Sequence, residues 1–172
     1  MTATPHMMAG AAIGKLTRRP WLAFPAAFAS HFLLDRVPHL DSHALFGVQH
    51  GGPTGLEAGT AIADIAVGVV LVVWAVGRQP GRRVMLGSAF FGVLIDLVDN
   101  VPPWGVWFTN WAGTAWLSTF HHAFQHNVTP AEWPLGVGTQ LAVIAAALGV
   151  ILRRRRTAGR SSSGENTAST TA

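Results

Sequence analysis

The chain contains no cysteine and no tyrosine, and only 12% of its 172 residues are charged. The lack of cysteine excludes disulfides, thiolate metal sites and a cysteine nucleophile, so any metal would need His, Asp or Glu ligands. An average soluble domain carries about 25% charged residues. Together with 49% hydrophobic residues and a mean hydropathy of +0.34, this scarcity of charge predicts an integral membrane protein.

The net charge of +4 arises at one end of the chain. Basic and acidic residues balance up to Leu152, and an arginine-rich segment follows from Arg153 onward. The sequence shows no phosphate-binding glycine loop and no nucleic-acid-binding motif, so nucleic acid is not an expected partner. We predict a single membrane domain over residues 1–156 and a disordered cytoplasmic tail over residues 157–172.

Four apolar segments predict an all-α bundle with about four transmembrane helices. These segments are residues 20–34, 59–77, 84–100 and 134–152. Basic residues beside them predict that the chain crosses the bacterial inner membrane with its C-terminus in the cytoplasm. The first segment would form only about 22 Å of helix, which is short for a bilayer. Arg18 and Arg19 before it also imitate a twin-arginine leader, which is the alternative to a first span.

Two further segments are too short or too polar to cross a membrane alone. Residues 7–13 predict a short N-terminal helix that forms a hairpin with the next one. Residues 104–126 are rich in Trp, Asn, Thr and His, and they predict an interfacial or re-entrant element. Trp104, Trp107 and Trp111 would share one helical face, either at the level of the lipid headgroups or packed against the other helices.

On this topology, the ionisable side chains converge on the extracytoplasmic face. They are His31, Asp35, His39, Asp41, His43, His50, Glu57, Asp64, Asp96, Asp99, His121, His122 and His126. Such groups are costly inside apolar helices, where they usually pair with one another or coordinate an ion. A set of His and Asp ligands without sulfur suits Zn²⁺, Mn²⁺ or Fe.

The spacing of these residues suggests which of them act together. His31 and Asp35 are four residues apart and share a helix face, and Asp96 and Asp99, three residues apart, also share a face. If the last histidine cluster is helical, His122 and His126 share a face and His121 points elsewhere.

Structural alternatives exist for several of these residues. Asp64 could pair with a Thr or a His and simply hold helices together. Asp41, His43 and His50 lie in or beside a Gly/Pro-rich loop, where water alone could solvate them.

Short motifs resemble those of the bacterial inner-membrane proteins called membrane-bound metal-dependent hydrolases. SHFLLD at residues 30–35 is similar to the SHxxxD motif of that family, and TPHMMAGAAIG is similar to the segment around its opening His, which is His6 here. HHAFQHN resembles the HRGFTHS motif at His121 and His126. In the family SHxxxD comes last, whereas here it comes second.

Two more resemblances involve the acidic residues and the end of the first predicted span. LIDLVDN resembles the PDxDH turn of the same family through Asp96 and Asp99. HFLLDRVPH is similar to the HxxxDxxxPxH pattern of zinc-dependent phospholipases C, with one residue fewer before the proline, and it adds His39.

Spacing and resemblance together predict a metal centre. Its candidate ligands are His31, Asp35, His121, His126, Asp96, Asp99, His6 and His39. The expected function is metal-assisted hydrolysis of a phosphoester or another lipid-linked bond at the extracytoplasmic face, with membrane lipids as partners. Two other classes stay open, namely a non-catalytic scaffold and a carrier of metal ions or protons that would use Asp64 and Asp96.

Overall fold

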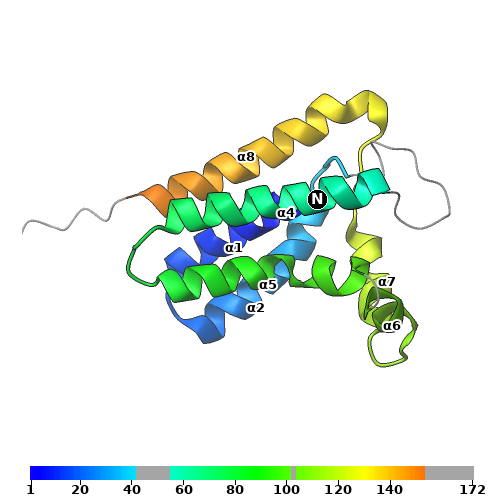
Figure 1. Ribbon diagram of the computed structural model, residues 1–172, viewed down its shortest axis with the longest axis horizontal. Coiled ribbons are helices and arrows are strands. Elements are labelled where there is room, and N and C mark those ends of the chain that lie inside the picture. Colours follow the sequence, from blue (N-terminus) through cyan, green and yellow to red (C-terminus); the bar gives the residue numbers. More distant parts are fainter. Residues whose placement is uncertain (42–54, 102–103, 154–172) are drawn as a thin grey trace, which may run out of the picture.

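The computed structural model describes residues 1–41, 55–101 and 104–153, which are almost entirely helical (Figure 1). The helices are α1 (Ala3–Thr17), α2 (Pro20–Asp35), α4 (Gly55–Val76), α5 (Arg82–Asn100), α6 (Trp104–Asn110), α7 (Ala115–Phe124) and α8 (Trp133–Leu152), with a 3₁₀ turn, η1 (Pro130–Glu132), before α8. The described residues form no strand, only an isolated bridge between His39 and Asn127. The all-α class is confirmed, whereas the tail at 157–172 lies outside the described residues.

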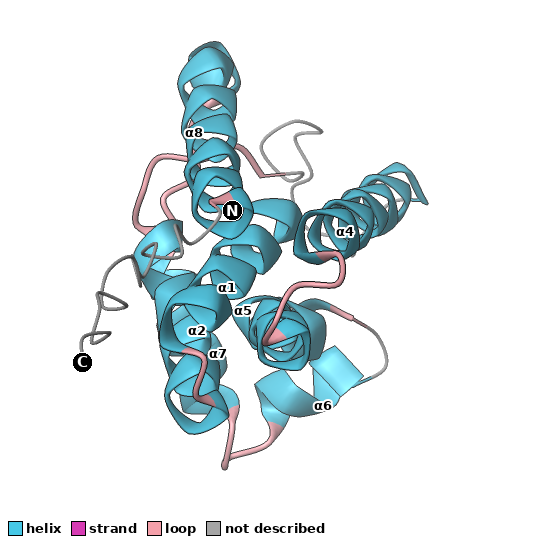
Figure 2. Cartoon of the chain, turned by 90° about the vertical axis from the view of Figure 1, so that its left-hand side faces the viewer, coloured by secondary structure: helices cyan, strands magenta, loops and turns pink. Residues whose placement is uncertain are grey.

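Helix α1 lies at the centre of the bundle, as the view along the helices shows (Figure 2). It contacts α2, α4, α5 and α8, and most of its residues between Thr4 and Gly14 are buried. The predicted short helix over residues 7–13 is therefore 15 residues long and forms the core of the molecule. Arg18, with a left-handed φ of 56°, ends α1, and Pro20 begins α2, which closes the expected hairpin.

Glycines let α1 and α5 approach each other backbone to backbone. A Cβ atom at Gly10 would lie 2.3 Å from the carbonyl oxygen of Ser88, and one at Gly92 would lie 2.6 Å from the carbonyl oxygen of His6. Small residues allow such close approach in membrane helix bundles, where dispersion contacts replace the hydrophobic effect between helices. This contact fixes the position of His6 against α5.

Polar contacts hold both ends of α1. At its first turn, the backbone N–H of Thr4 donates to Asp64 Oδ2 in α4 at 3.1 Å, and the Thr4 hydroxyl donates to the Asp64 carbonyl oxygen at 2.8 Å. In its last turn, the ammonium group of Lys15 donates to the Gln79 side chain and to the Ile151 carbonyl of α8. The predicted alternative in which Asp64 pairs with a Thr to hold helices together is thus observed.

Among the residues that the structure describes, two helices are long and apolar enough to cross a membrane. They are α4, with a mean hydropathy of 2.2, and the segment from Pro130 to Leu152, with a mean hydropathy of 2.1. A third span results if α5 and α6, which are bent by 83° relative to each other, count as one broken span. The predicted four-span bundle is not confirmed, because α2 has only 16 residues, or about 24 Å of helix.

The tryptophans near α6 lie on the surface. Trp104, Trp107 and Trp111 are 50%, 59% and 52% exposed, and the rings of Trp107 and Trp111 stack with their centroids 5.0 Å apart. These tryptophans do not pack into the helical core. The structure therefore fits a position at the level of the lipid headgroups better than packing against the other helices.

The contact between α1 and α5 yields a stability prediction. We expect Gly10→Ala to lower the free energy of unfolding by about 1–3 kcal/mol, because its new methyl group meets the Ser88 carbonyl. Gly138→Ala in α8 is the matched control: nothing lies within 4 Å of its Cβ position, so the change should stabilise by up to about 1 kcal/mol. Thermal melting in detergent measures both, and equal melting temperatures would contradict the close packing.

Candidate metal centre

Four helices meet at one end of the bundle and bring six ionisable side chains together. The α1–α2 hairpin places the start of α1 beside the end of α2, and the end of α5 and the last turn of α7 lie next to them (Figure 1). The six residues are His6, His31, Asp35, Asp96, Asp99 and His121, and the exposed side chain of His122 borders them as a seventh. Asp96 is the most exposed of the six, with 21% of its side chain accessible, whereas the other five residues are at most 6% exposed.

Two histidines face each other with fixed tautomers. His31 Nδ1 donates to the carbonyl oxygen of Gly92 at 2.9 Å, and His121 Nδ1 donates to Asp99 Oδ2 at 2.8 Å. Because both Nδ1 atoms carry the proton, both Nε2 atoms present lone pairs. These two Nε2 atoms are 3.1 Å apart, so a proton or a metal cation is required between them.

A carboxylate oxygen of Asp35 completes a compact set of three ligand atoms, and an oxygen of Asp96 lies near the same two nitrogens. Asp35 Oδ2 lies 3.1 Å from His31 Nε2 and 3.5 Å from His121 Nε2. Asp96 Oδ1 lies 3.5 Å and 3.4 Å from the same two nitrogens. Ligand atoms about 2.0–2.2 Å from a tetrahedral zinc ion are about 3.3 Å from one another. Asp35 Oδ2 is also buried and receives no hydrogen bond from the described residues, so this set fits a divalent metal.

Without a metal, the cluster retains a proton. Burial acts to lower the pKa of His121, but the carboxylates of Asp35, Asp96 and Asp99 around its ring prevail and raise the pKa to about 10. The imidazolium then supplies the positive charge that the buried carboxylates require. A divalent cation can replace that proton, since it supplies more positive charge to the same oxygens.

Asp99 orients a ligand histidine. Its Oδ2 atom accepts the proton of His121 Nδ1, and its Oδ1 atom accepts a hydrogen bond of 2.7 Å from the hydroxyl group of Ser118. A carboxylate behind a ligand histidine fixes the direction of the ring and increases the basicity of the nitrogen that binds metal. The structure thus favours a positioning role for Asp99 over the direct ligation expected from the sequence.

His6 borders the same cluster. Its ring stacks on that of His31 with centroids 3.9 Å apart, and its Nε2 atom lies 3.1 Å from Asp35 Oδ1. The amino group of Met1 lies 2.6 Å from the same oxygen. His6 also forms a possible metal-binding group with His31 and Asp96, so its place at the predicted centre is compatible with ligation.

His122 belongs to the site, although the sequence analysis did not select it. Its Nε2 atom lies 3.5 Å from Asp99 Oδ2, and its side chain is 52% exposed. The two residues and His121 form a third group with the geometry for a metal ion. In the sequence, the adjacent pair of His121 and His122 could have indicated that both belong to the site. The sequence does not show, however, which of the two rings points into the cluster.

His126 and His39 do not reach the cluster with their side chains. His126 is exposed, and its backbone contacts the end of α2, where its N–H donates to the Asp35 carbonyl oxygen at 2.8 Å. Helix α7 ends at Phe124, so the predicted helical pairing of His122 with His126 does not occur. His39 is buried, donates from Nδ1 to the carbonyl oxygen of Val37, and has a pKa lowered by that burial.

The remaining acidic and histidine residues lie elsewhere. Asp64 caps α1, Glu57 is buried in α4, and Asp41 is half-buried after α2. His43 and His50 lie outside the described residues. Of the thirteen residues that were predicted to converge on one face, only a smaller set comes together, and it lies at the ends of α1, α2, α5 and α7.

Comparison of the chain with protein-family models, with curated proteins and with solved structures gave no match. The resemblance of its motifs to those of metal-dependent hydrolases therefore remains a prediction. The geometry of the histidines and carboxylates is the independent argument for a metal.

The geometry predicts which substitutions release the metal. His31→Ala, Asp35→Ala and His121→Ala should each abolish stoichiometric metal binding, since each removes one atom of the three-atom set. Asp99→Asn should weaken binding by about 10–100-fold because it removes the carboxylate behind His121. Elemental analysis of detergent-purified protein measures the metal content.

His126→Ala is the matched control, because His126 is a histidine of the same segment with an exposed side chain. It should keep the metal content of the wild type. A wild-type protein that is folded but free of metal, or equal metal loss in His126→Ala, would show that the cluster is not a metal centre.

Proposed function

We propose that the protein is a membrane-embedded, metal-dependent hydrolase that cleaves a phosphoester of a lipid or lipid-linked substrate at the extracytoplasmic face. The observation that carries the proposal is the facing pair of His31 Nε2 and His121 Nε2, 3.1 Å apart. Two carboxylates adjoin the pair, and each imidazole has its other nitrogen occupied as a donor. This arrangement is typical of histidines that bind a metal.

Zinc is the metal we expect, since two imidazole nitrogens and a carboxylate oxygen 3.1–3.5 Å apart match three positions of its tetrahedral coordination. Mn²⁺ or Fe would suit the same ligand types. When bound, such a cation lowers the pKa of a coordinated water to about 7 and polarises a phosphoryl oxygen.

We assign the other roles in the reaction according to whether each side chain is buried or exposed. His31, His121 and Asp35 are buried and would hold the metal, while Asp99 keeps His121 in the required orientation. The accessible part of Asp96 marks the side from which a substrate arrives. We assign proton transfer to the leaving group to His122, which has an exposed ring and contacts Asp99.

The distribution of arginines supports an extracytoplasmic site. Arg18 and Arg19 join α1 to α2, Arg78 and Arg82 border the turn between α4 and α5, and Arg153 follows α8. All these junctions lie at the end of the bundle opposite the metal centre (Figure 1). Under the positive-inside rule that end is cytoplasmic, so the centre faces the other side.

Labelling of single cysteines tests this orientation in the cysteine-free chain. Pro80 lies between α4 and α5, Ala131 lies in η1, and both residues are exposed. Pro80→Cys should react with a membrane-impermeant maleimide only after permeabilisation, and Ala131→Cys should react in intact cells. Labelling in the reverse order would place the centre in the cytoplasm and refute that part of the proposal.

Hydrolysis should be measurable with the zinc-loaded protein reconstituted in vesicles that contain phospholipids or polyprenyl phosphates. His121→Ala should lower the rate of phosphate or headgroup release by several orders of magnitude, because it removes both a ligand and the associated water activation. The His126→Ala protein should retain a rate near that of the wild type.

Two outcomes would contradict the enzyme assignment. One is a metal-loaded protein that hydrolyses none of the panel, and the other is an unchanged rate in His121→Ala. A folded, metal-containing but inactive wild type would favour a structural or transport role for the centre.

A further inference from the structure

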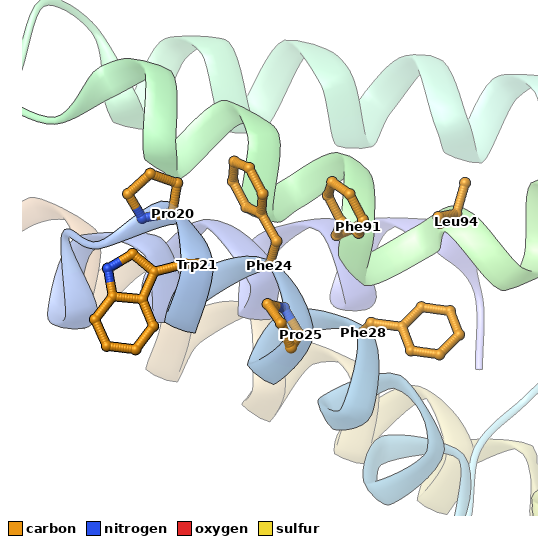
Figure 3. Close-up of a pocket in the computed structure, with 7 residues that line it drawn as sticks. All are labelled: Pro20, Trp21, Phe24, Pro25, Phe28, Phe91 and Leu94. Atoms are coloured by element: carbon orange, nitrogen blue, oxygen red, sulfur yellow. The ribbon is translucent and has the colours of Figure 1, made fainter.

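An apolar groove of about 490 Å³ runs along the surface between α2 and α5. Its walls include Trp21, Phe24 and Phe28 from α2 and Phe91 and Leu94 from α5 (Figure 3). The rings of Phe24 and Phe91, which both line the groove, stack with their centroids 4.8 Å apart. The residues that line the groove are prolines, phenylalanines, one leucine and Trp21, so the indole N–H of Trp21 is the only polar side-chain group among them.

The groove is aligned with the metal centre. Phe24, Phe28, His31 and Asp35 follow one another on the same face of α2, at intervals of four, three and four residues. At the end of the groove nearest the metal centre, the ring of Phe28 packs against Phe32, which in turn contacts the ring of His31. The groove therefore ends about one helical turn from the first metal ligand.

The surroundings of the groove are apolar as well. Trp21 is 66% exposed and Phe90, next to the groove on α5, is 51% exposed. In a chain with helices that cross a membrane, this face meets hydrocarbon chains of lipids. From Pro20 to Phe28 the groove follows about 12 Å of helix, which is the depth of a substantial part of one leaflet.

We propose that this α2–α5 groove holds a hydrocarbon chain of the lipid substrate while its phosphoester lies at the metal centre. This inference rests on the proposed function, and it specifies the substrate as a lipid bound by its chain. The part of the chain nearest the headgroup lies at Phe28 and Leu94, and the methyl end lies at Trp21. Apolar contacts along α2 then position the headgroup within reach of Asp96 and His122.

The reverse orientation is chemically possible, because the guanidinium group of Arg19 lies over the ring of Trp21, 5.9 Å from its centroid. A lipid phosphate bound there would direct its chain the opposite way. The two orientations predict opposite orders of contact along the groove, so a probe with two reporter positions can distinguish them.

The test uses two photoactivatable phosphatidylglycerols in phosphatidylethanolamine vesicles that contain the zinc-loaded protein. One probe carries its diazirine beside the ester and the other carries it at the methyl end of the chain. After irradiation, mass spectrometry maps the modified residues. We expect the first probe to label Phe28 and Leu94 and the second to label Trp21, each at least about tenfold more than the exposed face of α4.

Variants control for nonspecific contact with lipid. Leu94→Trp and, independently, Pro25→Phe fill the groove and should reduce labelling of its residues to the level of α4. Phe90→Trp is the matched control, since it adds bulk on α5 beside the groove, and it should label as the wild type does. Metal content and melting temperature establish that each variant is folded.

Every outcome decides the inference. Uniform labelling of α2, α4 and α8 would refute it, and so would a reversed order with the ester probe at Trp21. Because photolabelling requires no turnover, loss of the labelling gradient overturns the groove assignment alone. An intact gradient in a protein that hydrolyses no lipid would leave a lipid-binding groove and overturn the proposed enzyme function.

Discussion

The buried carboxylate of Asp35 is the constraint on which the arrangement of this end of the bundle depends. A charge in an apolar interior is costly unless partners surround it, and removal of one partner leaves the cost uncompensated. Here His6, His31 and His121 supply those partners from three different helices. Helices α1, α2 and α7 must therefore meet at one place. The resulting cluster has the geometry to hold either a proton on His121 or a metal cation in the place of that proton.

The bend after α5 is the second requirement for the site. Helix α6 leaves α5 at an angle of 83°, and Gly105 lies so close to the end of α5 that a Cβ atom there would be 2.7 Å from the carbonyl oxygen of Asp99. The change of direction allows α7 to return alongside α2 and α5 and present His121 to the carboxylates. A straight continuation of α5 would carry the chain away from the site.

The sequence was sufficient to predict local relationships and insufficient for those that depend on tertiary packing. The four-residue spacing of His31 and Asp35 correctly placed both on one face of a helix, and the apolar run in α4 was recognised as long enough to span. The choice between His121 and His126 depends on where α7 ends, and contacts of the next segment with α2 determine that end. The central position of α1 follows from its fit against α5 at Gly10, which no hydropathy pattern reveals.

The hydrogen bond from Lys15 to the Ile151 carbonyl has a consequence for how the molecule is made. The first helix of the chain depends on the last one to complete the environment of its ammonium group, and on α4 to satisfy its first turn through Asp64. During synthesis α1 emerges more than a hundred residues before α8, so its buried position cannot be established as it leaves the ribosome. The core around α1 is therefore complete only after α8 has been synthesised and packs its Ala147 and Ile151 against the other buried residues.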